Sequence, residues 1–263
     1  MPDSDDREQT SGSLWVSRRQ PEAVLGQSLR DAHGLTHSQP VAITPYLDES
    51  AFTYRISTTV TEERAGVRRL KLNERNNSMT VRMNPVTAAA TGLLDHIEKW
   101  SELRFRYDSH PEEGYIDARP SVPLRPQVAA NAGESLDVAP MVKSLFELDT
   151  KFGIDLTNRF VDAFGLAKRD PVAWRVSVRD GDLVLVGDFD VLDEDTPNVR
   201  LVQTHQSGVD DNLTEQYRLY IPKALVYMFD WQTEKLHFGA EPGRIVVTSA
   251  VETGLKQFTG END

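Results

Sequence analysis

The order of hydrophobic and polar positions repeats along the chain, and its clearest copy lies in the last fifth of the sequence. Residues 217–221 alternate and are rich in β-formers, which predicts a strand. Pro222 suits the first turn of a helix because its missing N–H costs nothing there, so a short helix is predicted over residues 223–229. Strands over residues 235–238 and 245–248 then form a hairpin.

The same order of one strand, one helix and two strands recurs in three earlier places. One copy has a strand over residues 80–83, a helix from Pro85 to Leu94, and strands over residues 103–107 and 115–118. The next has a strand over 153–156, a helix from the N-cap Thr157 to Phe164, and strands over 172–178 and 183–186 around Asp180-Gly181. The first has a strand over 14–17, a helix from Pro21 to His33, and strands over 41–44 and 52–56.

These copies predict a fold and a division into domains. Further candidate strands precede the last three copies, at residues 67–72, 142–148 and 199–204. One copy of about 45 residues is too small for a good core, whereas two copies with interleaved strands bury one. We therefore expect a mostly β protein with short helices, in which four β-α-β-β units form two tandem swapped-hairpin barrels; the alternative is an irregular α+β fold. The expected parts are a disordered acidic tail (1–12), a first barrel (13–130), a second barrel (131–255) and a C-terminal tail (256–263).

The composition excludes several classes of protein. The 263 residues include no cysteine, which rules out disulfides, thiolate zinc sites and thiol nucleophiles. No apolar run approaches the roughly 18–20 residues of a membrane-spanning helix. Residues 1–11 are acidic and polar, unlike a signal peptide, which needs a basic start and an apolar core. A cytoplasmic protein without a membrane partner is expected.

The net charge of -12 is unevenly distributed, so it does not exclude nucleic acid as a partner. Residues 131–263 carry 23 acidic and 13 basic side chains, whereas residues 13–130 carry 14 and 15. Arginine outnumbers lysine 21 to 8, and aspartate outnumbers glutamate 23 to 18. This bias indicates a halophilic archaeon as the source, because hydrated carboxylates keep proteins soluble at high salt. The alternative is an ordinary acidic protein from a GC-rich genome.

The last copy resembles a known family of DNA-binding domains. Its Ile221-Pro222-Lys223, the helix residues Ala224 and Leu225, and the aromatic Phe229 and Trp231 are similar to the AbrB/MazE/SpoVT swapped-hairpin family. The second copy has Met83-Asn84-Pro85 in place of Ile-Pro-Lys, and the third keeps the pattern without the proline. Unlike typical members, the last copy has an acidic first hairpin, residues 203–215, without lysine or arginine.

This resemblance implies a fold and a function. Two such units interlock into one small barrel in the family, so four units imply two barrels. Family members are mostly transcription regulators and antitoxins that contact DNA with basic residues of the first hairpin and its loop. The resemblance therefore implies a non-enzymatic transcription regulator that binds double-stranded DNA as a homodimer. The acidic second half would then pack, dimerise or bind a protein partner.

The most basic stretch of the chain, residues 64–82, is the candidate DNA-binding segment. This segment contains six basic residues and only one acidic residue, Glu74. Alternation places Arg69 and Lys71 on one side of the strand. The polar loop that follows can reach phosphates and base edges. The alternative is a solvated edge strand whose charges prevent aggregation. The candidate residues, including two at the end of the first strand, are Arg64, Arg68, Arg69, Lys71, Arg75, Asn76, Asn77, Arg82, Arg18 and Arg19.

No catalytic, metal or cofactor motif stands out in the sequence. Phosphate loops, dinucleotide fingerprints and nucleophile elbows are absent. The acidic run at 188–195 has Asp193 where a calcium-binding loop needs glycine. His33 and His37 are four apart, but they flank Gly34 and need not share a helix face, so the histidines give no metal signature. We therefore expect no enzyme, metal or cofactor. Two alternatives to the regulator remain: an interaction or assembly protein that reuses the barrel without DNA, and a sliding-clamp-like ring.

Overall fold

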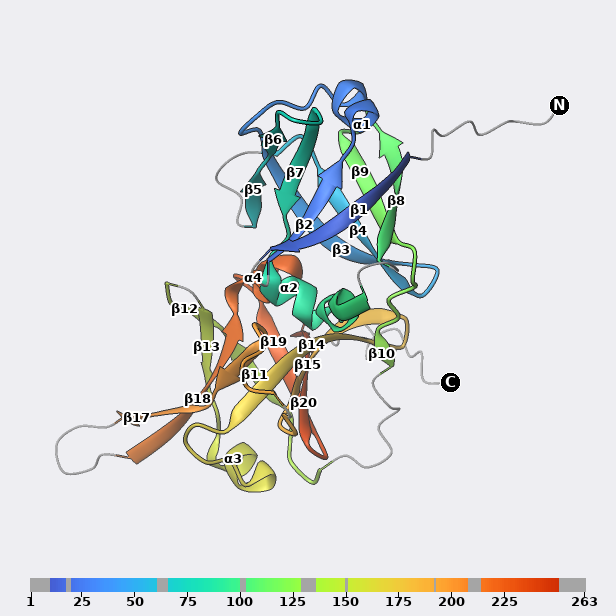
Figure 1. Cartoon of the computed structure of the whole chain (residues 1–263). Coiled ribbons are helices and arrows are strands. Elements are labelled where there is room, and N and C mark those ends of the chain that lie inside the picture. Colours follow the sequence, from blue (N-terminus) through green and yellow to red (C-terminus); the bar gives the residue numbers. More distant parts are fainter. Residues whose placement is uncertain are drawn as a thin grey trace. The chain divides into compact units, whose positions relative to one another are not determined.

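The chain divides into two compact units, Met1–Pro126 and Gln127–Asp263, which are described separately (Figure 1). The computed structural model describes residues 10–17, 20–60, 66–99, 103–128, 136–149, 151–191, 193–207 and 214–250. The described part is mostly β, and its strands pair antiparallel except for one short parallel pair, between β10 (Gln127–Val128) and β14 (Pro171–Arg179). The predicted mostly β class is confirmed at this level.

The first unit contains the elements of the first two copies. Its strands are β1 (Thr10–Ser17), β2 (Gln20–Leu25), β3 (Pro40–Asp48), β4 (Ala51–Ser57), β5 (Val67–Arg69), β6 (Lys71–Asn73), β7 (Ser78–Arg82), β8 (Arg104–His110) and β9 (Tyr115–Pro120). Its helices are α1 (Gln27–Ala32), α2 (Pro85–Ala90) and a 3-10 helix over Leu94–Lys99. β1 begins at Thr10 and so includes three residues of the stretch expected to be a tail.

Strand pairing joins the two copies of the first unit. The sheet runs in the order β5-β3-β4-β9-β8-β1-β2-β7-β6, so neighbours along the sheet are often distant along the chain. β2 pairs with β7, and β4 pairs with β9, each with the corresponding strand of the other copy. The strand that precedes each copy, here called its leading strand, also pairs with the other copy's hairpin: β1 with β8 and β5 with β3. For the first copy, β1 is predicted from the sequence as the strand of the copy itself; β2, predicted as part of the helix, takes that place in the pairing with β7. Neither copy therefore completes the sheet without the other.

The predicted helix from Pro21 to His33 is wrong in its first part. Gln20–Leu25 forms the strand β2, in which Pro21, Ala23 and Leu25 are buried while Glu22 and Val24 are half-buried. This alternation is that of a strand. Proline has no N–H to donate, which costs least near the start of a strand, and its carbonyl still accepts a hydrogen bond from the Met83 N–H at 2.8 Å. The helix α1 begins only after Gly26.

The second unit contains the elements of the last two copies. Besides β10 and β14 its strands are β11 (Met141–Ser144), β12 (Phe146–Glu147), β13 (Lys151–Asp155), β15 (Asp182–Asp188), β16 (Val199–Leu201), β17 (Gln203–Ser207), β18 (Thr214–Pro222), β19 (Lys235–Glu241) and β20 (Arg244–Ser249). Its helices are α3 (Asn158–Phe164) and α4 (Lys223–Met228). The predicted helix stop at Gly165 and the Asp180-Gly181 hairpin turn are confirmed, and these three residues have positive φ.

The second unit repeats the pairing scheme of the first. β13 pairs with β18 and β15 with β20, which are corresponding strands of the two copies. The leading strands β11 and β16 pair with β19 and β14 of the other copy's hairpin. The pairs form a larger sheet, β10-β14-β15-β20-β19-β11 with β16 beside β14, and a smaller one, β12-β13-β18-β17.

The leading strands are divided, where the sequence predicted continuous ones. Leu70 separates β5 from β6; its N–H donates to the Gln39 carbonyl at 3.0 Å, and its carbonyl accepts from the Ser38 N–H at 2.8 Å. Val202 separates β16 from β17 in the same way, bonded to Asp170 and Arg169 at 2.9 and 2.8 Å. Both side chains are buried. Because each leading strand is divided, its two parts pair with different strands. β5 pairs with β3 and β6 with β7, while β16 pairs with β14 and β17 with β18.

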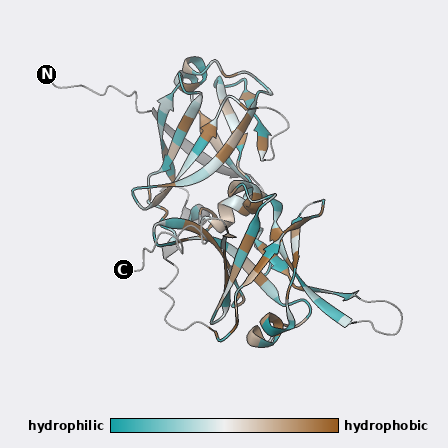
Figure 2. Ribbon diagram, turned by 180° about the vertical axis from the view of Figure 1, so that it is seen from behind, coloured by the Kyte–Doolittle hydropathy of each residue, from teal (hydrophilic) through white to brown (hydrophobic). Residues whose placement is uncertain are grey.

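Apolar side chains alternate with polar ones along the strands, as Figure 2 shows by brown and teal ribbon segments. Each unit has large, fully buried aromatic side chains, among them Tyr54, Phe105 and Tyr107 in the first and Phe152, Trp174 and Phe238 in the second. The helix residues Leu225 and Val226 are also buried, in agreement with a packing role for the apolar side of α4. Among the described residues, no helix is long and apolar enough to cross a membrane.

Core packing in the second unit predicts the effect of adding one methyl group. A Cβ at Gly187 in β15 would lie 2.9 Å from Ile245 Cγ2 and 3.1 Å from Trp174 Cζ3, and both of these side chains are buried. Gly187→Ala should therefore destabilise the unit by about 1–3 kcal/mol through overpacking. Gly239→Ala in β19 is the control, because its nearest neighbour is the Val246 carbonyl oxygen at 3.8 Å. Thermal denaturation followed by tryptophan fluorescence should show a lower midpoint for the first variant alone; equal midpoints would contradict this packing.

Candidate nucleic-acid interface

Strand register places two of the predicted cations on one sheet face. Thr80 of β7 lies opposite Lys71 of β6 on one side and opposite Val24 of β2 on the other. Arg82, two residues further along β7, lies opposite Glu22. Because side chains alternate along a strand, Lys71, Thr80 and Arg82 share the outer face, while Met79 and Val81 are buried on the inner face. We call Lys71, Thr80, Arg82 and the turn 74–77 the β6–β7 surface.

The cations of the β6–β7 surface differ in how they are engaged. The Arg82 Nε lies 2.8 Å from the Glu22 Oε1, but the Arg82 side chain is 59% exposed, so the pair is a weak surface ion pair. Lys71 and Arg75 are exposed, and neither forms an ion pair with a carboxylate of the described residues. A groove of about 500 Å³ lies beside them, lined by Glu22, Lys71, Leu72, Asn73, Glu74, Arg75 and Thr80. Both side chains are available to a ligand.

Hydrogen bonds and one backbone conformation shape the β6–β7 turn. The Asn73 Oδ1 accepts from the Arg75 N–H at 3.1 Å. The Asn76 Oδ1 accepts from both the N–H and the hydroxyl of Ser78, at 3.2 and 2.8 Å. Asn77 has a φ of 56°, in the left-handed region where asparagine is tolerated better than most residues. The polar loop predicted after residue 72 is thus held in one conformation by hydrogen bonds from its own side chains.

Arg30 also belongs to this surface, although it is not among the residues predicted from the sequence. Its Nη1 donates a hydrogen bond to the Asn77 Oδ1, which ties α1 to the β6–β7 turn across 47 residues of sequence. Arg30 lies in the last turn of α1, where a cation also suits the helix dipole, so it looked like an ordinary helix residue. No sequence signal distinguishes an arginine that only suits the helix dipole from one that also bonds the β6–β7 turn, because the contact depends on α1 packing beside β7.

The other predicted DNA-binding residues divide into two groups. Arg68 and Arg69 lie on β5, which pairs with β3 rather than with β7. Their guanidinium groups bond backbone carbonyls, Arg68 that of Val67 at 3.1 Å and Arg69 that of Ser38 at 2.9 Å. Arg64, Arg18 and Arg19 lie outside the described residues.

The corresponding sheet of the second unit, β12-β13-β18-β17, has cations that are already engaged. The Arg218 Nε lies 2.8 Å from the Asp155 Oδ1, and an Arg218 Nη lies 3.1 Å from the His205 Nε2. The hydrogen bond to Asp155 raises the pKa of Arg218. The Lys151 ammonium lies 3.6 Å from the centre of the Tyr220 ring. Lys223, at the start of α4 directly after β18, is paired with Glu147 of β12 at 2.5 Å. This face therefore offers less free positive charge than the β6–β7 surface.

A second polar cluster in the first unit holds strands together. Asp117 on β9 is buried and accepts from Arg55 Nε and Nη2, at 2.9 and 3.0 Å, and from the Tyr46 hydroxyl at 2.8 Å. Burial and the hydrogen bond to Asp117 raise the pKa of Tyr46 to about 12. Every charge here has a partner within the cluster, which joins β3, β4 and β9. The cluster therefore holds the three strands together, and its paired groups do not form a general acid or base.

Comparisons with known proteins add no identification: no family model, curated protein or solved structure matches the chain. Within the part of the chain that the structure describes, no group of three or more histidine, aspartate or glutamate side chains is placed to hold a metal ion. The candidate site is therefore judged on its own geometry and charge.

The conformation of Asn77 predicts a difference between two substitutions. Both Asn77→Gly and Asn77→Val remove the contact with Arg30, but only valine is strained at a φ of 56°. Valine should therefore cost about 1–2 kcal/mol more than glycine. Urea denaturation of both variants measures the difference. Equal stabilities would show that the turn does not hold residue 77 in the left-handed region.

Proposed function

We propose that the chain is a DNA-binding transcription regulator whose β6–β7 surface contacts double-stranded DNA. The carrying observation is that Lys71 and Arg75 are exposed beside a groove and are not neutralised by carboxylates of the described residues. Phosphate contacts need such free cations, because each one that neutralises a phosphate releases a counterion. The asparagine-rich turn next to them offers amide groups that can bond base edges.

The proposal includes the finer description of the fold, two tandem barrels of the AbrB-like swapped-hairpin type. It is supported by the shared pairing scheme, in which corresponding strands of two copies pair, β2 with β7 and β13 with β18. The leading strands cross to the other copy's hairpin in both units, as β5 does to β3 and β16 to β14. Interlocked copies of this kind are what the resemblance implies.

Charge distribution supports DNA contact by the first unit rather than the second. Residues 13–130 are nearly neutral, whereas 131–263 carry most of the excess acid. Repulsion from acidic groups decays over a Debye length of about 8 Å at 0.15 M salt, so distant carboxylates do not prevent local binding. Two copies of the chain would place two such surfaces on a pseudo-palindromic site.

A non-DNA-binding interaction or assembly protein is the second candidate. The observation in its favour is the engagement of Arg218 and Lys151 on the corresponding face of the second unit. Cations that are already engaged within the protein are not available to bind phosphates. On this view the cations of the β6–β7 surface keep an edge strand soluble.

Removing the two free cations tests the proposed surface. Lys71→Gln/Arg75→Gln should weaken binding to genomic DNA fragments roughly tenfold and make the slope of log affinity against log salt shallower by about 1–2. The matched control is Arg104→Gln/Arg106→Gln, two exposed cations on β8. Fluorescence anisotropy over a range of salt concentrations gives both quantities.

A further variant should act in the opposite direction. Glu22→Gln removes the carboxylate paired with Arg82 and should strengthen DNA binding while changing stability little, since the Arg82 side chain of the pair is mostly exposed. Absence of binding by the wild type at any salt would rule out the regulator. Unchanged binding by Lys71→Gln/Arg75→Gln, or an equal loss in the control, would exclude this surface while leaving the function open.

A further inference from the structure

The second unit has an open seam between its two sheets. β11 is the last strand of the larger sheet and pairs only with β19 among the described strands. β12 covers β13 only at Phe152 and Gly153, so the side of Asp155 that faces away from β18 has no strand partner among the described residues. Among the residues that the structure describes, nothing therefore pairs with the outer backbone edge of β11 or with the end of β13 at this seam.

Equivalent positions elsewhere in the chain are closed by backbone hydrogen bonds. Leu70 and Val202, between the two parts of their leading strands, are each bonded through both N–H and carbonyl to the loop that precedes a hairpin. Leu145 occupies the same place between β11 and β12, but no such pair of bonds joins it to the part of the chain that the structure describes. Its side chain is half-buried, whereas those of Leu70 and Val202 are buried. The leading strand of the third copy, β11 with β12, is thus held less fully than the leading strands of the second and fourth copies.

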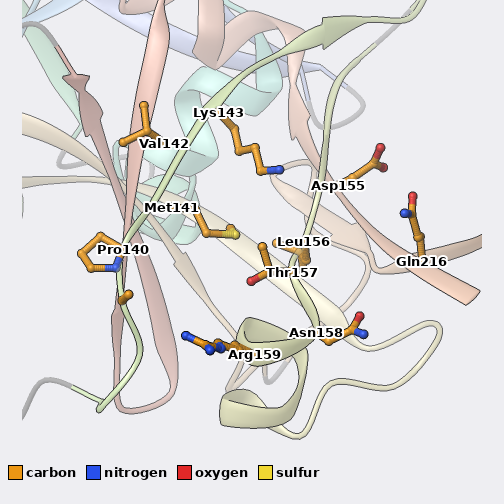
Figure 3. Close-up of a pocket in the computed structure, with 11 residues that line it drawn as sticks. Pro140, Met141, Val142, Lys143, Asp155, Leu156, Thr157, Asn158, Arg159 and Gln216 are labelled. Atoms are coloured by element: carbon orange, nitrogen blue, oxygen red, sulfur yellow. The ribbon is translucent and has the colours of Figure 1, made fainter.

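A cavity of about 660 Å³ occupies this seam (Figure 3). One wall is a continuous stretch of five residues that runs into β11, and the other follows the end of β13 into the start of α3. Figure 3 shows Lys143 on the β11 side, and Leu156 and Asn158 on the opposite side. The lining residues are Ala139, Pro140, Met141, Val142, Lys143, Asp155, Leu156, Thr157, Asn158, Arg159 and Gln216.

The charges and apolar groups of this seam define what fits it. Lys143 and Arg159 form no ion pair with the described carboxylates, whereas Asp155 is already bound by Arg218 at 2.8 Å. The free charge facing the cavity is therefore positive, in a unit that is acidic as a whole. Met141 and Leu156 supply a buried apolar floor, and Val142 beside it is 53% exposed.

We propose that this seam binds an extended acidic segment of a partner protein, which adds as a strand to the free edge of β11. Backbone hydrogen bonds to an exposed sheet edge give affinity, and pockets for alternate side chains give specificity. Lys143 and Arg159 would bind the acidic side chains of the segment, and the apolar floor would take the side chains between them. The site lies in the second unit, so it goes beyond DNA binding and does not depend on it.

The test uses the full chain and two short fluorescein-labelled peptides, in which valine alternates with glutamate or with lysine. The glutamate peptide should bind roughly tenfold more tightly at low salt, because charge complementarity at the seam selects it. Lys143→Glu and Arg159→Glu should each abolish this preference. Lys168→Glu is the matched control, since Lys168 is exposed and lies outside the lining of the cavity. Hydrogen exchange should show new protection on binding at those Met141–Ser144 amides that point away from β19.

Several results would overturn this proposal. Equal affinity for the two peptides, or no binding by either, would remove the acidic segment as the occupant. An equal loss in Lys168→Glu, or protection of amides outside β11, would place binding elsewhere. Displacement by citrate without any amide protection would assign the site to small carboxylates. Loss of DNA binding in Lys71→Gln/Arg75→Gln is a separate measurement on the other unit, so the two proposals fail independently.

Discussion

Antiparallel pairing between strands that lie far apart in the sequence is the constraint on which each half of this protein depends. A segment of about 45 residues is too small to bury a good core alone, because too much of its surface stays exposed. In the first unit β2 meets β7 and β4 meets β9, and in the second β13 meets β18 and β15 meets β20. Within each unit, these pairs bring residues from distant parts of the sequence into a shared core. The β6–β7 surface and the seam beside β11 are both consequences of that pairing.

Pairing also decides which charges are free. On β9 and β4, Asp117 and Arg55 lie directly opposite each other and neutralise one another. On β18 and β13, Arg218 and Asp155 do the same. Thr80 stands opposite Lys71, so no carboxylate reaches the lysine from the neighbouring strand. A cation's availability in a sheet is therefore set by the residue across the strand, which for Arg55 and Arg218 is distant in the sequence.

The sequence predicted the order of elements well and their boundaries less well. Asp180-Gly181 and Gly165 gave correct turns because they are suited to positive φ, a local property. Pro21 misled the prediction, since proline is compatible both with a helix start and with the beginning of a strand. The division of residues 67–72 at Leu70 was not predictable either, because it depends on bonds to Ser38 and Gln39. The candidate surface was predicted in part: Lys71 and Arg82 share one face, Arg68 lies on another strand, and Arg30 was missed.

The sequence by itself determined what is periodic or local: alternating strands, short helices, turn residues, and the uneven division of charge. These follow from side-chain alternation and backbone preference, which act over a few residues. Only the tertiary structure decided which strands meet, which cations are neutralised, and which sheet edge has no partner among the described strands. Those outcomes depend on contacts such as that of Arg30 with Asn77, and on the absence of a described strand beside β11. Neither is encoded in any short stretch of sequence, because each depends on how whole copies pack together.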